Sequence, residues 1–439
     1  MSEGVFDRVS NSTRFDRFRG EVMAGGSVTE RPPAPPDGDE DPAATRAGRL
    51  AGVAILGLFA WLAFVNGWMF LFVVGVLISV FLHETGHFVT ARLTGMKATQ
   101  FFLGFGPRLW SFQRGETEYG VRLLPLGAFV RIIGMNNLDE VPPEDEEQTY
   151  RRKSFPRRML VITAGSLMHL LLAVVLFFIV FSVRGELVEG VGAEVGTVVE
   201  SGPAADAGIR DGDVILAVDG APLERADDLG PAIRSYSPGD AITLDVLRDG
   251  ERLEIEAGLG ANTSVPEDNA LFGTALLGVA SGPVGEWESM TIGKAATSSV
   301  TELFPSTWNS VKGVVQVLNP VNIFDHLSGR TDDLATRPTT LIGVTQVSGV
   351  VGEAEGAIGV IYILAALNVF VGVFNMFPLL PLDGGHAAIA VYERVREGRS
   401  RRRYFADVDK LMPFAMGVIV VLLVLFMSGL YLDLTKSLG

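Results

Sequence analysis

The sequence contains no cysteine and only five histidines among its 439 residues. The absence of cysteine excludes disulfides, thiol catalysis, and zinc or iron–sulfur sites with cysteine ligands. Positive charge is also scarce, with 36 Lys and Arg against 51 Asp and Glu, which gives a net charge of −15. Proteins that bind nucleic acid need a basic surface. We therefore expect no nucleic-acid partner.

Long apolar segments dominate the rest of the composition. Four stretches carry no charged residue, namely 51–82, 159–183, 357–382 and 411–432. About 20 apolar residues in a helix cross the hydrocarbon core of a bilayer, and a helix satisfies its own backbone groups there. The sequence therefore predicts a polytopic α-helical membrane protein and excludes a soluble globular one.

The N-terminal region is ambiguous in one respect. Residues 1–49 are polar, rich in Pro and acidic residues, and lack an early apolar core, which predicts a disordered tail and no secretory signal peptide. The stretch 51–82 would span about 48 Å as one helix, too long for a single upright crossing. Because Asn66-Gly67 is a turn signal, we favour an extra membrane helix at 50–65 and a second at 68–93. One tilted helix with the tail outside remains the alternative, so the count is four or five helices.

Charge in the loops predicts the topology. Loops that stay in the cytoplasm are enriched in Lys and Arg. Two basic segments, 150–158 and 392–410, fit this pattern, and so do Arg46 and Arg49 at the end of the tail. We therefore expect these segments to be cytoplasmic. The long region between the apolar stretches 159–183 and 357–382 is then extracytoplasmic.

The first apolar region ends in a metal-binding pattern. Residues 83–87 read His-Glu-Thr-Gly-His, a match to H-E-x-x-H. Residues four apart share one face of a helix, so His83 and His87 can reach one metal, and neutral imidazole suits Zn²⁺. Glu84 can then act as a general base toward water. A histidine pair that only bonds backbone or solvent is disfavoured, because ionisable groups at the end of an apolar helix are costly.

A third ligand must come from elsewhere, because catalytic zinc usually has three protein ligands. Residues 375–386 read NMFPLLPLDGGH and follow directly on an apolar stretch. Prolines and glycines break a helix, and an acid at such a break in or near the membrane is more plausibly a ligand than a solvated loop residue. We expect Asp383 to be the third ligand. His386 is the competing candidate, and we expect it to be a hydrogen-bonded neighbour instead.

Taken together, these motifs resemble the site-2 protease family of intramembrane zinc metalloproteases. An H-E-x-x-H in an early membrane helix and a late N-x-x-P-x-x-P-L-D-G are similar to the bacterial regulator-of-sigma-E-protease type, in its single-PDZ, actinobacterial form. The resemblance runs from Trp68 to about Leu432. It also includes the stretches Gly104–Pro107, Glu116–Gly120 and Leu124–Phe129. It implies that His83, His87 and Asp383 bind Zn²⁺ and that Glu84 is the catalytic acid/base.

The sequence departs from this family at two places. Residues 164–169 read AGSLMH, where the family usually shows A-G-P-x-x-N. We expect His169 to pack or hydrogen-bond between helices rather than to bind the metal. The spacer between Pro378 and Pro381 is also one residue longer than in some relatives. Neither departure touches the four residues to which the resemblance assigns catalysis.

Two soluble elements are predicted between the apolar segments. Residues 101–135 alternate in places and are punctuated by Gly and Pro, which predicts short β-strands. The family resemblance implies a membrane-associated β-element whose edge can bind an extended peptide, and an ordinary cytoplasmic hairpin is the alternative. Residues 187–260 resemble an inserted PDZ domain, a β-rich α+β module that binds peptides or chain ends. Whether it recruits substrates or excludes bulky proteins by size is open. Residues 261–350 are expected to contain amphipathic helices.

The residues beside the predicted ligand Asp383 suggest substrate handling. Asn375 is a polar group in an apolar stretch, and its amide can compete for backbone groups of an unwound substrate helix. An interhelical hydrogen bond is the alternative role. We expect Asn375, Pro378 and Pro381 to position the substrate.

The sequence thus predicts a multi-pass zinc metalloendopeptidase of a bacterial cytoplasmic (inner) membrane, with its active site near the cytoplasmic side. By resemblance, its partners are lipid, a peptide at the PDZ groove, and single-span membrane proteins such as anti-sigma factors or remnant signal peptides. The alternatives are an inactive scaffold that presents the PDZ domain and a membrane-bound protease that cuts soluble loops. A zinc transporter is disfavoured because a PDZ domain has no evident use there.

Overall fold

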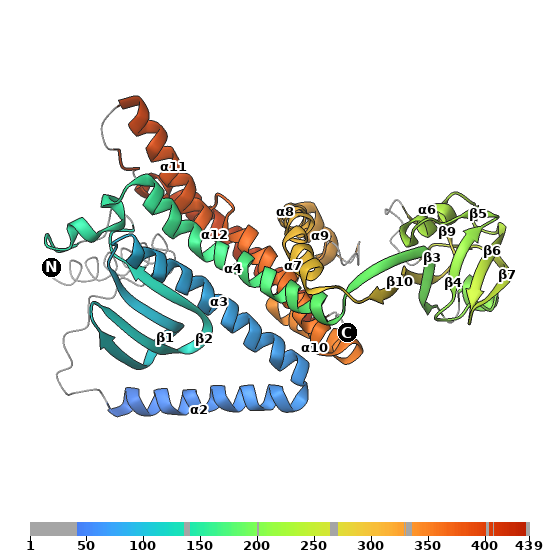
Figure 1. Ribbon diagram of the computed structural model, residues 1–439, viewed down its shortest axis with the longest axis horizontal. Coiled ribbons are helices and arrows are strands. Elements are labelled where there is room, and N and C mark those ends of the chain that lie inside the picture. The colour runs from blue at the N-terminus through green and yellow to red at the C-terminus, as the bar shows by residue number, and fades with distance from the viewer. Residues whose placement is uncertain are drawn as a thin grey trace, which may run out of the picture. The chain divides into compact units, whose positions relative to one another are not determined.

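The structure, a computed structural model, describes residues 42–135, 141–199, 202–263, 271–328, 330, 336–400, 404–406 and 408–435. It divides into two compact units, which are described separately here (Figure 1). The helical unit comprises Met1–Val180, Thr297–Leu318 and Pro338–Gly439. The β-rich unit comprises Phe181–Ala296 and Asn319–Arg337. Most of the predicted tail, residues 1–41, lies outside the described residues.

Within the described residues, the first apolar region forms two helices, with a break where the turn signal predicted it. Helix α2 spans Pro42–Val65 and α3 spans Gly67–Leu93. Between them Asn66 adopts an extended conformation, and its side chain accepts hydrogen bonds from the first backbone amides of α3 as an N-cap. The predicted disorder of residues 42–49 is wrong, because they belong to α2. Proline is well tolerated in a first helical turn, and the alanines after it are strong helix formers.

In the described part of the chain, four helices are long and apolar enough to cross a membrane. They are α3, α4 (Phe155–Val183), α10 (Leu341–Asn375) and α12 (Met412–Thr435). Three of them contain the predicted spans 68–93, 159–183 and, apart from its first residue, 411–432. In α2 the described apolar part, Gly52–Val65, is shorter than these spans.

The third predicted span, 357–382, needs correction. Helix α10 ends at Asn375, and a turn of seven residues separates it from α11 (Asp383–Ser400). Proline cannot continue a helix, and Pro378 and Pro381 both fall in this turn. Helix α10 also starts earlier than predicted and is kinked at Gly356, whose φ of 69° is non-helical. The straight part after the kink, about 28 Å long, is close to the thickness of a hydrocarbon core.

Polar contacts tie the spanning helices together at one end of the helical unit. Asn66, at the start of α3, donates a hydrogen bond of 3.2 Å to Glu353 in the first half of α10. Asp433, near the end of α12, accepts hydrogen bonds of 2.7 Å from both the backbone amide and the hydroxyl of Thr340, the N-cap of α10. We call this the distal end. Helices α3 and α10 start there, and α12 ends there.

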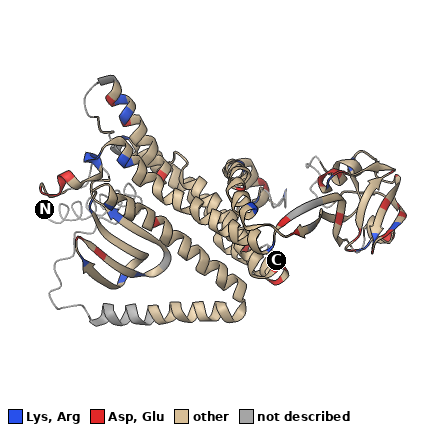
Figure 2. Ribbon diagram, in the orientation of Figure 1, with Lys and Arg blue, Asp and Glu red and all other residues tan. Residues whose placement is uncertain are grey.

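The opposite end of the helical unit carries a buried ion pair. Arg158, in the first turn of α4, contacts Glu393 of α11 at 2.5 Å, and both side chains are almost fully buried. Lys and Arg also gather at this end, over α11 and the segment before α4 (Figure 2). We call it the basic end. Helix α4 starts at the basic end and α3 finishes there. Since α3 and α10 start at the distal end and α12 finishes there, α3 and α10 run antiparallel to α4 and α12.

A long β-hairpin fills the connection from α3 to α4. Strand β1 spans Ala98–Arg114 and β2 spans Thr117–Ile132, so the β-element predicted at 101–135 is present and starts three residues earlier. Near the turn, Arg114 pairs with Thr117, and near the open end Leu103 pairs with Ala128. Two short 3₁₀ turns, Glu146–Gln148 and Tyr150–Arg152, lead from the hairpin into α4.

The β-rich unit is built on a six-stranded sheet in the order β10-β3-β4-β6-β7, with β5 beside β4. The strands are β3 Glu186–Val198, β4 Val214–Val218, β5 Ala221–Pro222, β6 Ala241–Arg248, β7 Glu251–Gly258 and β10 Val279–Glu288. A smaller pair, β8 Gly260–Ala261 and β9 Ala275–Leu276, and the short helices η3 Ala226–Asp228, α5 Pro203–Asp206 and α6 Leu229–Arg234 complete it. Apolar residues from these elements form one core.

The predicted boundary of this domain at residue 260 is too early. Strand β10 pairs antiparallel with β3 along nearly all of its length, so the sheet runs on to Glu288. The region expected to hold amphipathic helices, 261–350, therefore begins with strands. Its helices are α7 (Ile292–Thr301), α8 (Leu303–Val317) and α9 (Pro320–Leu327), and the last connection of the chain includes the 3₁₀ turn η4 (Val408–Leu411).

Candidate metal centre

Helix α3 presents two histidines to one point inside the helical unit. His83 and His87 are one turn apart and each is only 8% exposed. Helix α4 approaches closely at this level because Gly86 has no side chain: a Cβ there would lie 2.8 Å from the carbonyl oxygen of Ala164. Small residues at a helix contact let the backbones come together. The sequence of α3 therefore places its histidines against α4 and not in lipid.

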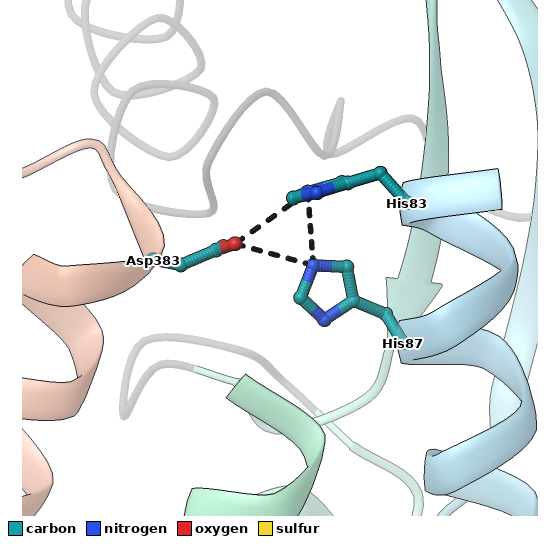
Figure 3. A group of neighbouring side chains, drawn as sticks. All are labelled: His83, His87 and Asp383. Atoms are coloured by element: carbon teal, nitrogen blue, oxygen red, sulfur yellow. Dashed lines mark hydrogen bonds and ion pairs between the residues drawn. The ribbon is translucent and has the colours of Figure 1, made fainter. Parts of the chain in front are cut away.

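Asp383 reaches the same point from the far end of the sequence (Figure 3). Its Oδ2 lies 3.5 Å from Nε2 of His83 and 3.3 Å from Nε2 of His87, and the two Nε2 atoms are 3.1 Å apart. Among the described residues, these three form the group whose geometry suits a metal ion. The three ligands predicted from the sequence thus converge.

The turn before α11 delivers Asp383 as the first residue of that helix. The two glycines that follow it are required by close packing. A Cβ on Gly384 would collide with the backbone of Met376, and a Cβ on Gly385 would lie 2.7 Å from the backbone nitrogen of Leu380. The D-G-G sequence therefore lets the start of α11 fold back onto the turn that follows α10.

Hydrogen bonding determines the tautomer of one histidine. Nδ1 of His87 lies 2.7 Å from the backbone oxygen of Val161 in α4. A carbonyl oxygen only accepts, so Nδ1 carries the proton, and Nε2 of the neutral ring presents a lone pair toward Asp383. This arrangement is typical of a histidine that binds metal, in which the second nitrogen is oriented by a backbone acceptor.

The donor atoms fit a zinc ion. A lone pair of His87 faces a carboxylate oxygen, and Oδ2 of Asp383 is buried without a hydrogen-bond partner among the described residues. Such a group of acceptors is repulsive unless a cation lies between them. Tetrahedral zinc with bonds of about 2.0–2.1 Å to nitrogen sets its ligand atoms about 3.3 Å apart, close to the separations found here.

The backbone of α4 forms one wall of the centre. A Cβ at Gly165 would collide with Cε1 of His83 and Nε2 of His87, and would lie 2.7 Å from Nδ1 of His83. The space in front of the histidines therefore exists only because residue 165 is glycine. The sequence contains this glycine in the run AGSLMH, but nothing in the pattern alone assigns it to the metal centre.

Glu84 borders the centre without joining the ligand group. Its Oε1 is 4.0 Å from Nε2 of His83, and its side chain is 18% exposed. The carboxylate also interacts with the backbone amide of Val130 in β2. A carboxylate beside the metal-facing nitrogen, and held by a strand, has the position expected of a general base.

The other predicted residues occupy distinct places. Asn375 ends α10, is half-buried, and its side chain has no hydrogen bond in the described part of the chain, whereas Asn368 is 1% exposed and fully engaged. Pro378 is exposed and Pro381 half-buried in the turn that follows Asn375. His386 is half-buried one turn after Asp383 and stays outside the ligand group.

Comparison with known proteins agrees with this geometry. Residues 71–425 match the family described as Peptidase family M50. The chain belongs to peptidase family M50. The zinc metalloprotease Rip1 of Mycobacterium tuberculosis is 34% identical over 396 residues, which cover 83% of this chain and 96% of that relative. Rip1 of Mycolicibacterium smegmatis is 30% identical over 402 residues, covering 84% and 97%. The M50 chain described here is thus an intramembrane zinc metalloendopeptidase.

One solved structure resembles a small part of the chain. The PDZ domain of the SdrC-like protein from Listeria monocytogenes is 23% identical, covers 21% of this M50 chain and 90% of its own, and has a TM-score of 0.19. Because this TM-score is low, the likeness adds nothing to the description of the β-rich unit, whose fold rests on its own strand order. Residues 42–65, which form α2, precede the region matched by the family.

Proposed function

We propose that this protease hydrolyses peptide bonds within or next to the transmembrane segment of single-span membrane proteins, with His83, His87 and Asp383 as zinc ligands and Glu84 as acid/base. The observation that carries the proposal is the convergence of these four residues within the bundle of spanning helices. A site at this depth meets the apolar segment of a substrate rather than its soluble domains.

The chemistry follows from the residues around the centre. When bound, Zn²⁺ polarises the scissile carbonyl and makes water more acidic. Glu84 takes the proton of the attacking water and delivers it to the leaving amine nitrogen, since its carboxylate borders the metal-facing side of His83. Val161 keeps the lone pair of His87 directed at the centre. Because Gly165 has no side chain, it leaves room in front of the histidines for the metal and the scissile peptide.

The β-hairpin offers a surface for the substrate. A transmembrane helix bonds its own amides internally, so it must be extended before it is cut. Residues 128–132 of β2 pair with β1 along one side, and no strand pairs with their other side among the described residues. Val130, in this stretch, interacts with Glu84. An extended substrate that adds to this edge would pass beside the general base.

Asn375 is suited to act on a substrate whose helix has been unwound. Its amide has no intramolecular hydrogen bond in the described structure, and Asn375 is the last residue of α10, directly before the turn that leads to Asp383. A free amide at this position can pair with backbone groups of the opened substrate. Pro378 and Pro381 keep this turn from becoming helical.

The depth of the centre supports cleavage near the cytoplasmic side of a bacterial cytoplasmic membrane. His83 is about 15 Å along α3 from Leu93, at the basic end, and about 24 Å from Gly67, at the distal end. Basic residues at the first of these ends favour a cytoplasmic location for it. The chain enters the β-rich unit after α4, which finishes at the distal end, so this unit is extracytoplasmic in the proposal.

The β-rich unit is proposed to be a PDZ-type module that selects substrates. Within this unit, a helix α6 lies between strands β4 and β6 in the sequence, and the sheet carries a continuous apolar core. A module of this kind binds extended chain ends beside a strand. It would either recruit trimmed substrates by their new chain ends or exclude those that still carry bulky outer domains.

The test is a comparison of membrane proteomes. Cells that produce the active protease are compared with cells that produce the Glu84→Gln variant, and the termini of accumulating and disappearing fragments are mapped. We expect new termini inside apolar segments of single-span proteins in the active sample alone. Termini confined to soluble loops would favour the alternative of a membrane-bound protease that cuts loops. Identical proteomes would favour an inactive scaffold.

A further inference from the structure

The two histidines of the metal centre are held in different ways. His87 is oriented by its hydrogen bond to the backbone oxygen of Val161. His83 is held less firmly: its Nδ1 is buried and makes no hydrogen bond of regular geometry to the described residues, although the backbone of Gly165 lies near it. An imidazole that is not fixed by a hydrogen bond can rotate about its side-chain torsions. The orientation of His83 must therefore come from the groups packed against it.

Helix α4 supplies those groups from two consecutive turns. Gly165 lies so close to the imidazole of His83 that any side chain there would collide with it. His169 lies four residues later, on the same face of α4, and its ring centroid is 5.0 Å from that of His83, with 43° between the planes. His169 is only 3% exposed. The ring of His83 is thus bounded by a glycine backbone and by a second imidazole.

His169 is itself fixed by a chain of hydrogen bonds. Its Nδ1 lies 2.8 Å from Oδ1 of Asn368 in α10, and Nδ2 of Asn368 donates to the backbone oxygen of Leu364 at 2.8 Å. Because a carbonyl oxygen only accepts, the amide orientation of Asn368 is determined, and Nδ1 of His169 must carry the proton. Nδ2 of Asn368 also donates to Ser79 of α3 at 3.0 Å.

The chain of hydrogen bonds ends on α3, the helix that carries the proposed ligand His83. Ser79 precedes His83 by four residues, so the two side chains lie on one face of α3. Asn368 is 1% exposed and Ser79 is 4% exposed, which makes this a buried network across α3, α4 and α10. Buried and satisfied polar networks hold their members in one arrangement. The network therefore holds His169 in one position relative to His83.

We propose that His169 is a positioning residue for the zinc ligand His83. Its ring, anchored through Asn368 and Ser79, supplements the irregular contact between Nδ1 of His83 and the backbone of Gly165. This inference rests on the proposed assignment of His83 as a zinc ligand. Residues that orient a metal ligand typically change metal affinity by about 10–100-fold when they are replaced.

Two matched variants separate the effect of the aromatic ring at position 169 from the effect of its hydrogen bond to Asn368. His169→Leu and His169→Phe both lose the hydrogen bond to Asn368, so any cost to folding from that loss is common to them. Only His169→Phe keeps a flat ring beside His83. Full-length protein in detergent is stripped of metal, and its zinc affinity is measured by competition with a chelating indicator. The visible spectrum of Co²⁺-loaded protein reports the geometry of the ligands.

We expect His169→Leu to lower zinc affinity by about tenfold or more and to shift the Co²⁺ bands, while His169→Phe recovers most of both. Equal effects of the two variants, or no effect of either, would overturn the positioning role. His83→Ala serves as the reference for the site. If His83→Ala binds zinc like the unmodified protein, the proposed metal centre is wrong; if it loses zinc and His169→Leu does not, only the role of His169 is wrong.

Discussion

The backbone oxygen of Val161 accepts a hydrogen bond of 2.7 Å from Nδ1 of His87. Through this contact α4 determines which nitrogen of a histidine in α3 faces Asp383. The carboxylate arrives from α11, so three segments that are far apart in the sequence build the centre. A substitution where α3, α4 or α11 contacts the metal centre should therefore affect metal binding before it affects the fold of the bundle.

Replacing Asp383 should empty the metal centre, whereas replacing His386 should not. Asp383→Ala removes one of three converging ligand atoms, so we expect zinc content and activity to be lost together. His386→Ala leaves those three atoms in place. Metal analysis of both purified variants decides the matter. Retention of zinc by Asp383→Ala together with its loss from His386→Ala would mean that the histidine is the third ligand.

A single methyl group on α4 should also prevent metal binding. Gly165→Ala places a Cβ against both His83 and His87, and we expect zinc affinity to fall by about tenfold or more. Gly417→Ala is the matched control, because no atom lies within 4 Å of a Cβ at that position of α12. Chelator competition on the two variants provides the measurement. Similar zinc affinity in both would show that α4 is not a wall of the centre.

Much of this arrangement follows from the sequence. The spacing of His83 and His87 and the helix break before Asp383 indicate which side chains meet, and uncharged stretches locate the spanning helices. The supporting contacts are different in kind. Val161 acts through its backbone oxygen and Gly165 through the lack of a side chain, so neither role can be recognised from residue type or spacing.

The errors of the sequence analysis have physical causes. The span predicted at 357–382 extends past the prolines because residues 376–382 carry no charge, and an uncharged turn beside a spanning helix looks like helix by composition. The boundary of the β-rich unit was placed before β10 because that strand pairs with β3 across about 90 intervening residues. Pairing over such a distance has no local signal. His169 was expected to pack or hydrogen-bond, and it does bond Asn368.

The β-rich unit should lose stability in acid through one buried carboxylate. Asp213 is 1% exposed and receives hydrogen bonds of 2.7 Å from Nε and Nη2 of Arg248. This guanidinium holds the pKa of Asp213 below its usual value, although burial opposes the shift. A lowered folded-state pKa contributes stability that is complete above the unfolded value, about 3.9, and is lost as the pH falls through the folded value.

Hydrogen exchange of the β4 and β6 amides in the full-length protein, corrected for intrinsic pH effects, tests the predicted loss of stability in acid. Protection should fall below about pH 4 in the unmodified chain, and Asp213→Asn should lack this part of the pH dependence. Arg248→Met leaves the buried carboxylate without its ion-pair partner and with the backbone amide of Arg210 as its remaining donor, at a cost of about 3 kcal/mol at neutral pH. Unchanged protection in the Arg248→Met variant would contradict the assigned role of the pair.

Single cysteines should report the topology, because the chain has none of its own. Ser154 is exposed at the basic end, and Ser237 is exposed in the β-rich unit. A cysteine at Ser154, or at Ser12 in the tail, should be shielded from an impermeant thiol reagent in intact cells, because arginine-rich loops stay in the cytoplasm. A cysteine at Ser237 should react, and permeabilised cells, in which all three react, provide the control. Labelling of Ser12→Cys in intact cells would place the tail outside and reduce the crossings from five to four, and labelling of Ser154→Cys would reverse the proposed orientation.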